Sequence, residues 1–449
     1  MQKDTIAAIS TALGESAISI VRMSGPDVFS LANALFSGKD LHSAQSHTLH
    51  YGKIYDGQTM IDEVLVSVFK APKTFTREHM VEINCHGGIY AAKKILELLL
   101  VNGARLAEKG EFTERAFLNG RIDLTQAESI MDIIESRSEQ SLTLAAKGVD
   151  GKIYSLVSRL RDNLLDIIAA IEVNIDYPEY DDVETLTTET IVPKINALQE
   201  EIRDVLSKAK VGRVLKEGVK TAIIGRPNVG KSSVLNALLR EDKAIVTEIQ
   251  GTTRDTVEGE INIGGVVLKL IDTAGIRDSQ NMIEKIGIDK ARAMIDEAQL
   301  ILYVLNNNEP LNDEDEKLLK MTENKSRIVI INKIDLENKI ERTFKDSVQI
   351  SALRGTNIDA LEQRIENLFL GGEVSLEDTT YLSNARQIAK MRQVKNYLDE
   401  SLYSAQNLMP VDMIEIDLKN AWETLGEIIG QTKDSALIDE LFSKFCLGK

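Results

Sequence analysis

One short segment near the middle of this 449-residue chain constrains its fold more than any other. Residues 225–232 read G-R-P-N-V-G-K-S, which fits G-x-x-x-x-G-K-S; they follow the apolar run 219–224 and precede the helix-like run 233–240. In such a loop, glycines let backbone N–H groups surround phosphates, a lysine neutralises the β and γ oxygens, and a serine hydroxyl can ligate Mg²⁺. The segment predicts an α/β domain that binds a nucleoside triphosphate.

Three further motifs belong to the same site: two of them indicate which base is bound, and D-T-A-G would serve Mg²⁺ and the γ-phosphate. Residues 332–335 read N-K-I-D after the apolar run 328–331. The segments D-T-A-G at 272–275 and S-A-L at 351–353 likewise each follow an expected strand. An aspartate can accept two hydrogen bonds from the N1–H and 2-amino edge of guanine, and adenine offers no matching donor pair. We therefore expect a guanine nucleotide-binding domain (G domain).

Composition limits the remaining choices. Hydrophobic residues make up 43% of the chain, with 28 glycines and 7 prolines, which is typical of a compact, helix-rich protein of several domains. The net charge of −17 disfavours a generic RNA-coating protein, so contact with nucleic acid would need a local basic patch or a partner. Two cysteines, no long apolar run and no secretory leader pattern predict a cytosolic location without membrane association.

The pattern of apolar residues divides the chain into four parts. We expect a mixed α+β domain over residues 1–118, with strands at 17–21, 60–69 and 80–84 and a helix at 90–100, and a G domain over 216–372. Helical patterns fill 119–215 and 373–449. Helices on both sides of a self-contained G domain favour its insertion into one helical bundle, although two separate bundles would fit the same pattern.

Several segments resemble a known family. They are E-I-N-C-H-G-G at 82–88, G-E-F-T-E-R-A-F-L-N-G-R at 110–121, G-T-T-R-D at 251–255 and the terminal F-C-L-G-K. Together with the G motifs they resemble the tRNA-modification GTPase MnmE (TrmE) family over essentially the whole chain. The resemblance implies a multidomain α/β fold: an N-terminal folate-binding-like and dimerisation domain, a helical domain and an inserted Ras-like G domain.

The same resemblance implies an activity and partners. The expected protein is a cytoplasmic homodimer that hydrolyses GTP. In a heterotetramer or larger complex with the flavoprotein MnmG, it adds a carboxymethylaminomethyl or aminomethyl group to C5 of the wobble uridine (U34) of certain tRNAs. A tetrahydrofolate derivative, 5,10-methylene or 5-formyl, would supply a one-carbon unit. FAD and NADH are expected on the partner, since no G-x-G-x-x-G dinucleotide loop occurs here.

The expected G-domain site has one catalytic residue and two kinds of metal ligand. Ile276 follows the D-T-A-G motif and cannot orient the attacking water, so the resemblance assigns that role to Glu284. Ser232 and Thr253 are the expected Mg²⁺ ligands. For K⁺, which would stimulate hydrolysis as two G domains pair, the expected ligands are Asn228, Thr247, Ile249 and Thr252. The full set of expected GTP-binding residues is Asn228, Val229, Gly230, Lys231, Ser232, Ser233, Thr247, Glu248, Ile249, Gln250, Gly251, Thr252, Thr253, Asp272, Thr273, Ala274, Gly275, Asn332, Lys333, Asp335, Ser351, Ala352 and Leu353.

The folate site is expected from the resemblance alone. It places Arg22, Glu82, Arg121 and Lys449 around the ligand, where a carboxylate such as Glu82 can accept hydrogen bonds from a pterin edge. Cys446 is a candidate reactive thiol, with a structural or positioning role as the alternative. The neighbours Cys85 and His86 lack a spaced second pair, so we expect no zinc site.

One alternative function shares the G domain. A regulatory GTPase of the ribosome-assembly type would have the same nucleotide motifs. Such proteins normally carry a KH or other RNA-binding module, and no basic module with a GXXG loop is recognised here. The N-terminal segment and the terminal F-C-L-G-K favour the tRNA-modifying class.

Overall fold

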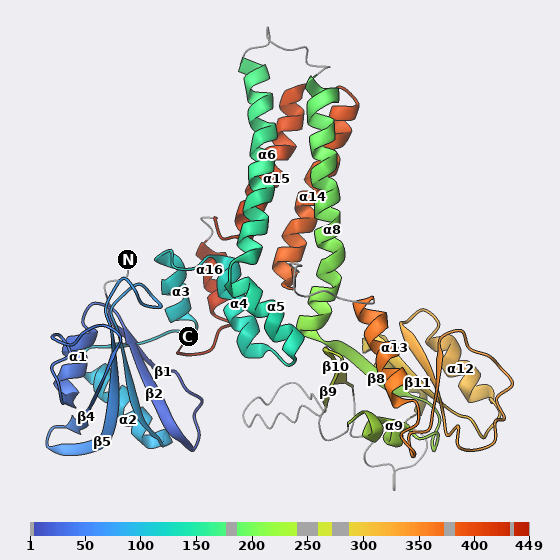
Figure 1. Cartoon of the computed structure of the whole chain (residues 1–449), viewed down its shortest axis with the longest axis horizontal. Coiled ribbons are helices and arrows are strands. Elements are labelled where there is room, and N and C mark those ends of the chain that lie inside the picture. Colours follow the sequence, from blue (N-terminus) through green and yellow to red (C-terminus); the bar gives the residue numbers. More distant parts are fainter. Residues whose placement is uncertain are drawn as a thin grey trace. The chain divides into compact units, whose positions relative to one another are not determined.

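The structure is a computed structural model, and it describes residues 4–176, 186–239, 259–271, 287–371, 382–431 and 435–448. The chain forms two compact units, residues 1–131 with 426–449, and residues 132–425 (Figure 1). In the parts that are described, no helix is both long and apolar enough to cross a membrane.

A seven-stranded sheet with the order β3-β4-β5-β6-β2-β1-β7 forms the centre of the first unit. Its strands are β1 (Ile6–Ile9), β2 (Ser16–Ser24), β3 (Phe36–Ser37), β4 (Thr48–Asp56), β5 (Thr59–Phe69), β6 (Met80–Gly87) and β7 (Arg105–Leu106). Alternate residues of the long strands are buried, for example Val64, Val66 and Val68, as expected for a sheet covered on one face. That face packs against α1 (Val28–Leu35) and α2 (Ile89–Val101) in one apolar core.

The first unit also contains helices from both ends of the chain. These are α3 (Glu111–Leu118), α4 (Leu124–Glu135) and α16 (Ser435–Phe442). Phe442 and Phe445 join Ala127 and Met131 in a small apolar cluster, which holds the C-terminal segment in this unit. The chain end therefore returns to the N-terminal domain.

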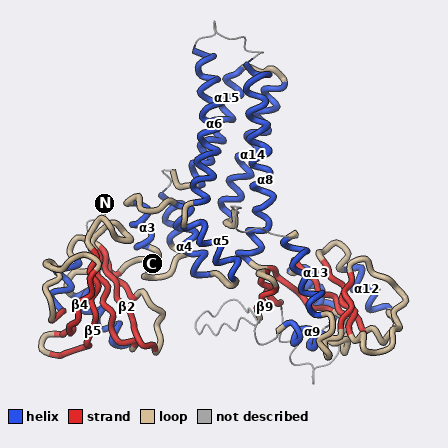
Figure 2. Tube along the Cα trace, viewed as in Figure 1, coloured by secondary structure: helices blue, strands red, loops and turns tan. Residues whose placement is uncertain are grey.

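Long helices form a bundle in the second unit (Figure 2). They are α5 (Glu139–Val149), α6 (Lys152–Asp176), α8 (Val192–Glu217), α14 (Ala385–Gln406) and α15 (Val411–Ile428), with a π-helical turn η1 (Leu186–Ile191) before α8. Helix α8 packs along α14, and Gln199 Nε2 donates to Asp399 Oδ1 at 2.9 Å. Since α8 precedes the G domain and α14 follows it, the expectation that the G domain is inserted into one bundle is confirmed.

The G domain contains a six-stranded sheet with the order β13-β12-β11-β8-β10-β9. The strands are β8 (Val219–Ile224), β9 (Glu260–Ile263), β10 (Val266–Leu270), β11 (Leu300–Asn306), β12 (Arg327–Asn332) and β13 (Ser347–Ile350). All neighbouring strands are parallel except the β9–β10 hairpin. Helices α9 (Lys231–Leu238) and α13 (Ile358–Leu370) pack on one face, and α11 (Gly287–Glu297) and α12 (Asp313–Met321) on the other.

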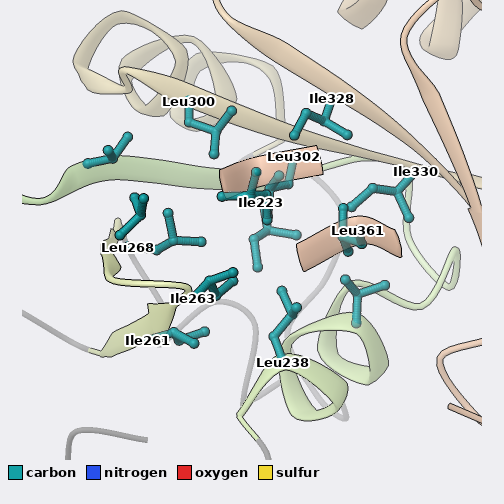
Figure 3. Close-up of a cluster of buried hydrophobic side chains, with 14 of the residues drawn as sticks. Ile223, Leu238, Ile261, Ile263, Leu268, Leu300, Leu302, Ile328, Ile330 and Leu361 are labelled. Carbon is teal, nitrogen blue, oxygen red and sulfur yellow. The ribbon is translucent and has the colours of Figure 1, made fainter. Parts of the chain in front are cut away.

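The two faces of this sheet are buried by alternate residues of the same strand. Successive residues of β11 divide between the faces: Leu300, Leu302 and Val304 lie on the α9 side, and Ile301, Tyr303 and Leu305 lie on the α12 side. Figure 3 shows the α9 side, where Leu302, Ile330 and Leu361 belong to one cluster. Burial on both faces explains the continuous apolar runs in the sequence.

The expected elements of the N-terminal domain are present, together with strands that were not expected. The expected strands 17–21, 60–69 and 80–84 and the helix 90–100 correspond to β2, β5, β6 and α2. The additional strands β1, β3 and β7 have only two to four residues, and β4 mixes polar and apolar residues on both of its faces. In strands that are short or of mixed polarity, the alternation of apolar and polar residues is too weak to recognise in the sequence. These segments become strands because they pair with neighbouring strands.

Candidate functional site

The phosphate-binding loop connects β8 to α9. Its backbone has positive φ angles at Gly225 (148°), Asn228 (63°) and Gly230 (100°). A Cβ atom on Gly225 would lie 2.3 Å from the Val304 carbonyl oxygen, and one on Gly230 would lie 2.3 Å from Asn332 Nδ2. Both positions therefore require glycine for conformation and for space.

Lys231 begins helix α9 and is directed back into the loop. Its Nζ donates to the carbonyl oxygens of Gly225 and Arg226, each at 2.8 Å. Burial lowers the pKa of the Lys231 ammonium. The two carbonyls are neutral, so the positive charge of Lys231 has no negative partner among them. The β and γ phosphate oxygens of a bound nucleotide would supply that negative charge.

The guanine motif contacts the phosphate-binding loop directly. Asn332 donates through Nδ2 to the Val229 carbonyl at 3.0 Å and accepts through Oδ1 from the Ala352 N–H at 3.0 Å. Lys333 Nζ donates to the Asn228 carbonyl at 2.8 Å. The motif thereby joins the loops after β8, β12 and β13 at the carboxyl edge of the sheet, where nucleotides bind in folds of this kind.

Asp335 carries the expected base-reading carboxylate. Ser351 Oγ donates to Asp335 Oδ1 at 2.6 Å, and this hydrogen bond lowers the pKa of Asp335. The carboxylate is therefore ionised at neutral pH and can accept from a guanine edge. Leu353 lies on the same loop as Ser351 and is 87% exposed.

Part of the expected G site lies outside the described residues. This applies to the segment 247–253, to the D-T-A-G motif at 272–275 and to Glu284. The assignments of all the Mg²⁺ and K⁺ ligands and of the water-orienting residue remain predictions. Asn228 and Ser232 belong to the described loop.

Two of the expected folate-site residues meet in the first unit. Arg22 on β2 and Glu82 on β6 are direct cross-strand partners, and the Nε and Nη2 atoms of Arg22 each lie 2.7 Å from Glu82 Oε1. Their side chains are 22% and 19% exposed. Both of these contacts end on Oε1, so the second carboxylate oxygen, Oε2, is a further acceptor of the kind that the amino-pyrimidine edge of a pterin requires.

The C-terminal tail lies against the same strands. Arg22 Nη1 donates to the Gly448 carbonyl at 3.2 Å, and Ser10 Oγ donates to the same oxygen at 3.1 Å. The Gly110 N–H donates to the Cys446 carbonyl at 3.3 Å, and the Cys446 side chain is exposed. Lys449 is outside the described residues. The tail therefore brings Cys446 within two residues of the Arg22 contact.

Arg121 occupies a different position from Arg22. Its guanidinium lies 5.8 Å from the centroid of the Phe75 ring, and that of Arg22 lies 5.8 Å from the Phe112 ring. Phe75 and Phe112 pack in one small apolar cluster. The two arginines therefore flank a shared cluster, and neither aromatic residue was among those expected from the sequence.

Cys85 and His86 point to opposite faces of β6. Cys85 is buried, its Sγ donates to the Ser19 carbonyl at 3.3 Å, and burial raises its pKa to about 11. His86 is exposed and its Nδ1 lies 2.7 Å from Asp62 Oδ1. An alternating strand separates adjacent side chains, so the two residues cannot act on one ligand.

Sequence reasoning also missed Ser10 and Gly448 as contacts of the tail. Gly448 has a φ of 86°, and a Cβ there would lie 2.5 Å from the Ile9 carbonyl oxygen. The only signal in the sequence was the glycine within the terminal F-C-L-G-K. Ser10 carries no local pattern that distinguishes it from other loop serines.

The strand order, the phosphate-binding loop and the guanine motif together define a P-loop GTP-binding protein with a G domain. Family models match residues 5–121 as the GTP-binding protein TrmE N-terminus and residues 124–446 as the MnmE helical domain. The chain belongs to the tRNA modification GTPase MnmE family, and it is accordingly a GTP hydrolase.

Relatives match this chain over its full length. The tRNA modification GTPase MnmE of Bacillus cytotoxicus is 50% identical over 458 residues and covers 100% of both chains. That of Ligilactobacillus salivarius is 52% identical, covering 99% of this chain and 98% of its own. A crystal structure of Aquifex aeolicus Era bound to GDP and aluminium fluoride is 30% identical over 40% of this chain and 66% of its own, with a TM-score of 0.26. The strand order above, and not this partial superposition, defines the fold.

Proposed function

We propose that this tRNA modification GTPase acts with a flavoprotein of the MnmG type on the wobble uridine (U34) of certain tRNAs. It would add a carboxymethylaminomethyl or aminomethyl group at C5. The observation that supports this proposal most is that the chain has a second site besides the G site. In that second site Arg22 pairs with Glu82 and contacts the tail that carries Cys446. A homodimer is part of this proposal.

Each site would have its own task. In the G domain, Asp335 reads guanine, Lys231 neutralises phosphate oxygens and Glu284 orients the attacking water. Ser232 and Thr253 would hold Mg²⁺, and Asn228, Thr247, Ile249 and Thr252 would hold K⁺, which supplies positive charge where no arginine finger is evident. These ligand sets come from the family resemblance.

The pair Arg22–Glu82 would bind a tetrahydrofolate derivative. Glu82 Oε2 can accept from the pterin edge, and Arg22 holds Glu82 in place through Oε1. Arg121 and Lys449 are the proposed cationic groups for the glutamate tail of the ligand. A tetrahydrofolate derivative, when bound, supplies the one-carbon unit.

GTP hydrolysis in K⁺ and in Na⁺ tests the proposed G-site mechanism. We expect K⁺ to stimulate the wild type at least about tenfold over Na⁺, and Glu284→Ala to lose about 100-fold in kcat, the scale of a missing water-positioning group. Glu323→Ala, at an exposed position of the same domain, is the matched control. Equal rates in both salts would contradict the mechanism and favour a regulatory GTPase.

Tetrahydrofolate binding tests the second site separately. Glu82→Gln replaces an acceptor oxygen by a donor, and we expect calorimetry to show at least about tenfold weaker binding of 5-formyltetrahydrofolate. Glu63→Gln, on neighbouring strand β5 and exposed, should bind as the wild type does. Unchanged affinity in Glu82→Gln would move the folate site elsewhere.

A further inference from the structure

Arg226 occupies the first variable position of the motif G-x-x-x-x-G-K-S in the phosphate-binding loop. Its side chain is only 13% exposed, with Nε 2.9 Å from Asp315 Oδ2 and Nη2 3.2 Å from Glu309 Oε2. The motif G-x-x-x-x-G-K-S does not require a charge here. The burial of the Arg226 side chain must therefore be explained by the residues that it contacts.

Asp315 is fixed from several sides at the start of α12. It is fully buried, and the Tyr303 hydroxyl donates to its Oδ1 at 3.1 Å. The Asn312 N–H donates to its Oδ2 at 3.2 Å, and the Asn312 side chain accepts from the Asp315 N–H at 3.0 Å, which completes a capping box. A buried carboxylate held in this way gives Arg226 a rigid partner.

On the other side, Arg226 is part of the loop that surrounds Lys231. The Arg226 carbonyl accepts from Lys231 Nζ at 2.8 Å. The preceding residue, Gly225, lies against Val304, the neighbour of Tyr303 on β11. The side chain and backbone of one residue thus connect the β11–α12 segment to the phosphate-binding lysine.

We propose that Arg226 is a positioning residue for nucleotide binding. Through its ion pair with Asp315 it holds the first half of the phosphate-binding loop, and with it the carbonyl that orients Lys231, in the arrangement that receives the phosphates. Preorganised loops bind more tightly because less ordering is needed when the ligand arrives. Its burial and its two carboxylate partners make Arg226 unsuited to reach a nucleotide on another chain.

Nucleotide release from the full-length protein tests this role. Arg226→Met keeps much of the side-chain volume and removes the charge; stopped-flow release of N-methylanthraniloyl-GDP should accelerate about tenfold. Arg226→Lys keeps a cation without the planar guanidinium and should fall between that variant and the wild type. Arg342→Met is the control, because Arg342 pairs with Glu316 on the same helix at an exposed site.

Melting of the nucleotide-free protein separates positioning from stability alone. A merely structural role would lower the melting temperature and leave release from the folded protein unchanged, which would overturn the proposal. If Arg226→Met does not fold, Tyr303→Phe removes only the hydroxyl that holds Asp315 and should still accelerate release about threefold. Release within about twofold of the wild type in every folded variant would overturn the proposal as well.

Discussion

His86 and Asp62 form a pair in which a titratable imidazole faces a carboxylate, with His86 Nδ1 2.7 Å from Asp62 Oδ1. The hydrogen bond that His86 Nδ1 donates to Asp62 raises the pKa of His86 above its usual 6.5. Asp62 also accepts the His86 N–H at 2.8 Å, so the carboxylate is held where the ring can reach it. Because the folded pKa is the higher one, the pair stabilises the fold below pH 6.5 and this contribution disappears as the pH rises through the folded pKa.

The pH dependence of stability checks this pair. We expect the free energy of unfolding of the wild type to exceed that of His86→Gln by more at about pH 5.5 than at about pH 8.5, since glutamine cannot become charged. Chemical denaturation of both proteins at the two pH values measures the difference. A difference that does not change with pH would contradict the assignment.

At the scale of elements, the end of the C-terminal tail requires one particular backbone conformation, at Gly448. Gly448 has a positive φ and lies against the Ile9 carbonyl and Ser10 Cα, where a side chain has no room. Its carbonyl accepts from Arg22 and Ser10. Gly448 therefore fixes the last residues of the tail, beyond the Phe442–Phe445 cluster and the Gly110–Cys446 hydrogen bond that hold the preceding residues.

Substitution of this glycine should release the tail. Gly448→Ala would place a Cβ 2.5 Å from a backbone oxygen, so we expect faster amide hydrogen exchange in residues 440–448. Gly88→Ala is a matched control in the same unit, because nothing lies within 4 Å of its Cβ position. Exchange that is the same in Gly448→Ala and the wild type would show that the contact does not hold the tail.

Element prediction succeeded where the pattern is local. The strand and helix around the phosphate-binding loop follow from an apolar run and a motif, and β8 and α9 lie there, although α9 starts at Lys231 and not at 233. Strand β4 was missed, because its exposed face carries Leu49 and Tyr51 among polar residues. Its burial pattern results from pairing with β5 and cannot be read from its own residues.

At the scale of the whole molecule, the core of the G domain includes residues from outside the expected boundary at 216. Leu144 on α5 and Leu215 on α8 are 7% and 1% exposed and pack in the cluster that contains Leu268 and Leu361. A Cβ on Gly265, in the β9–β10 turn, would also meet the Gln140 side chain of α5 at 2.3 Å. Helices of the bundle thus help to bury the apolar face of the nucleotide-binding sheet.

Truncation of Leu144 should therefore destabilise the G domain. We expect Leu144→Ala to lower its free energy of unfolding by about 2–4 kcal/mol, the usual cost of deleting a buried leucine side chain. The free energy of unfolding is measured by denaturant titration, with release of a bound fluorescent guanine nucleotide as the signal of G-domain unfolding. Leu142→Ala, which is 46% exposed on the same helix, should change stability by less than about 0.5 kcal/mol, and equal losses in both variants would contradict this packing.

The sequence by itself determined the class of nucleotide, the G domain and its place within helical segments. Those features depend on motifs and periodicities a few residues long, which set backbone conformation locally. Only the tertiary structure decided which distant residues meet: Arg22 with Glu82 and Gly448, and Arg226 with Asp315. Such contacts depend on strand register and on packing between segments far apart in the chain, for which a single sequence contains no local signal.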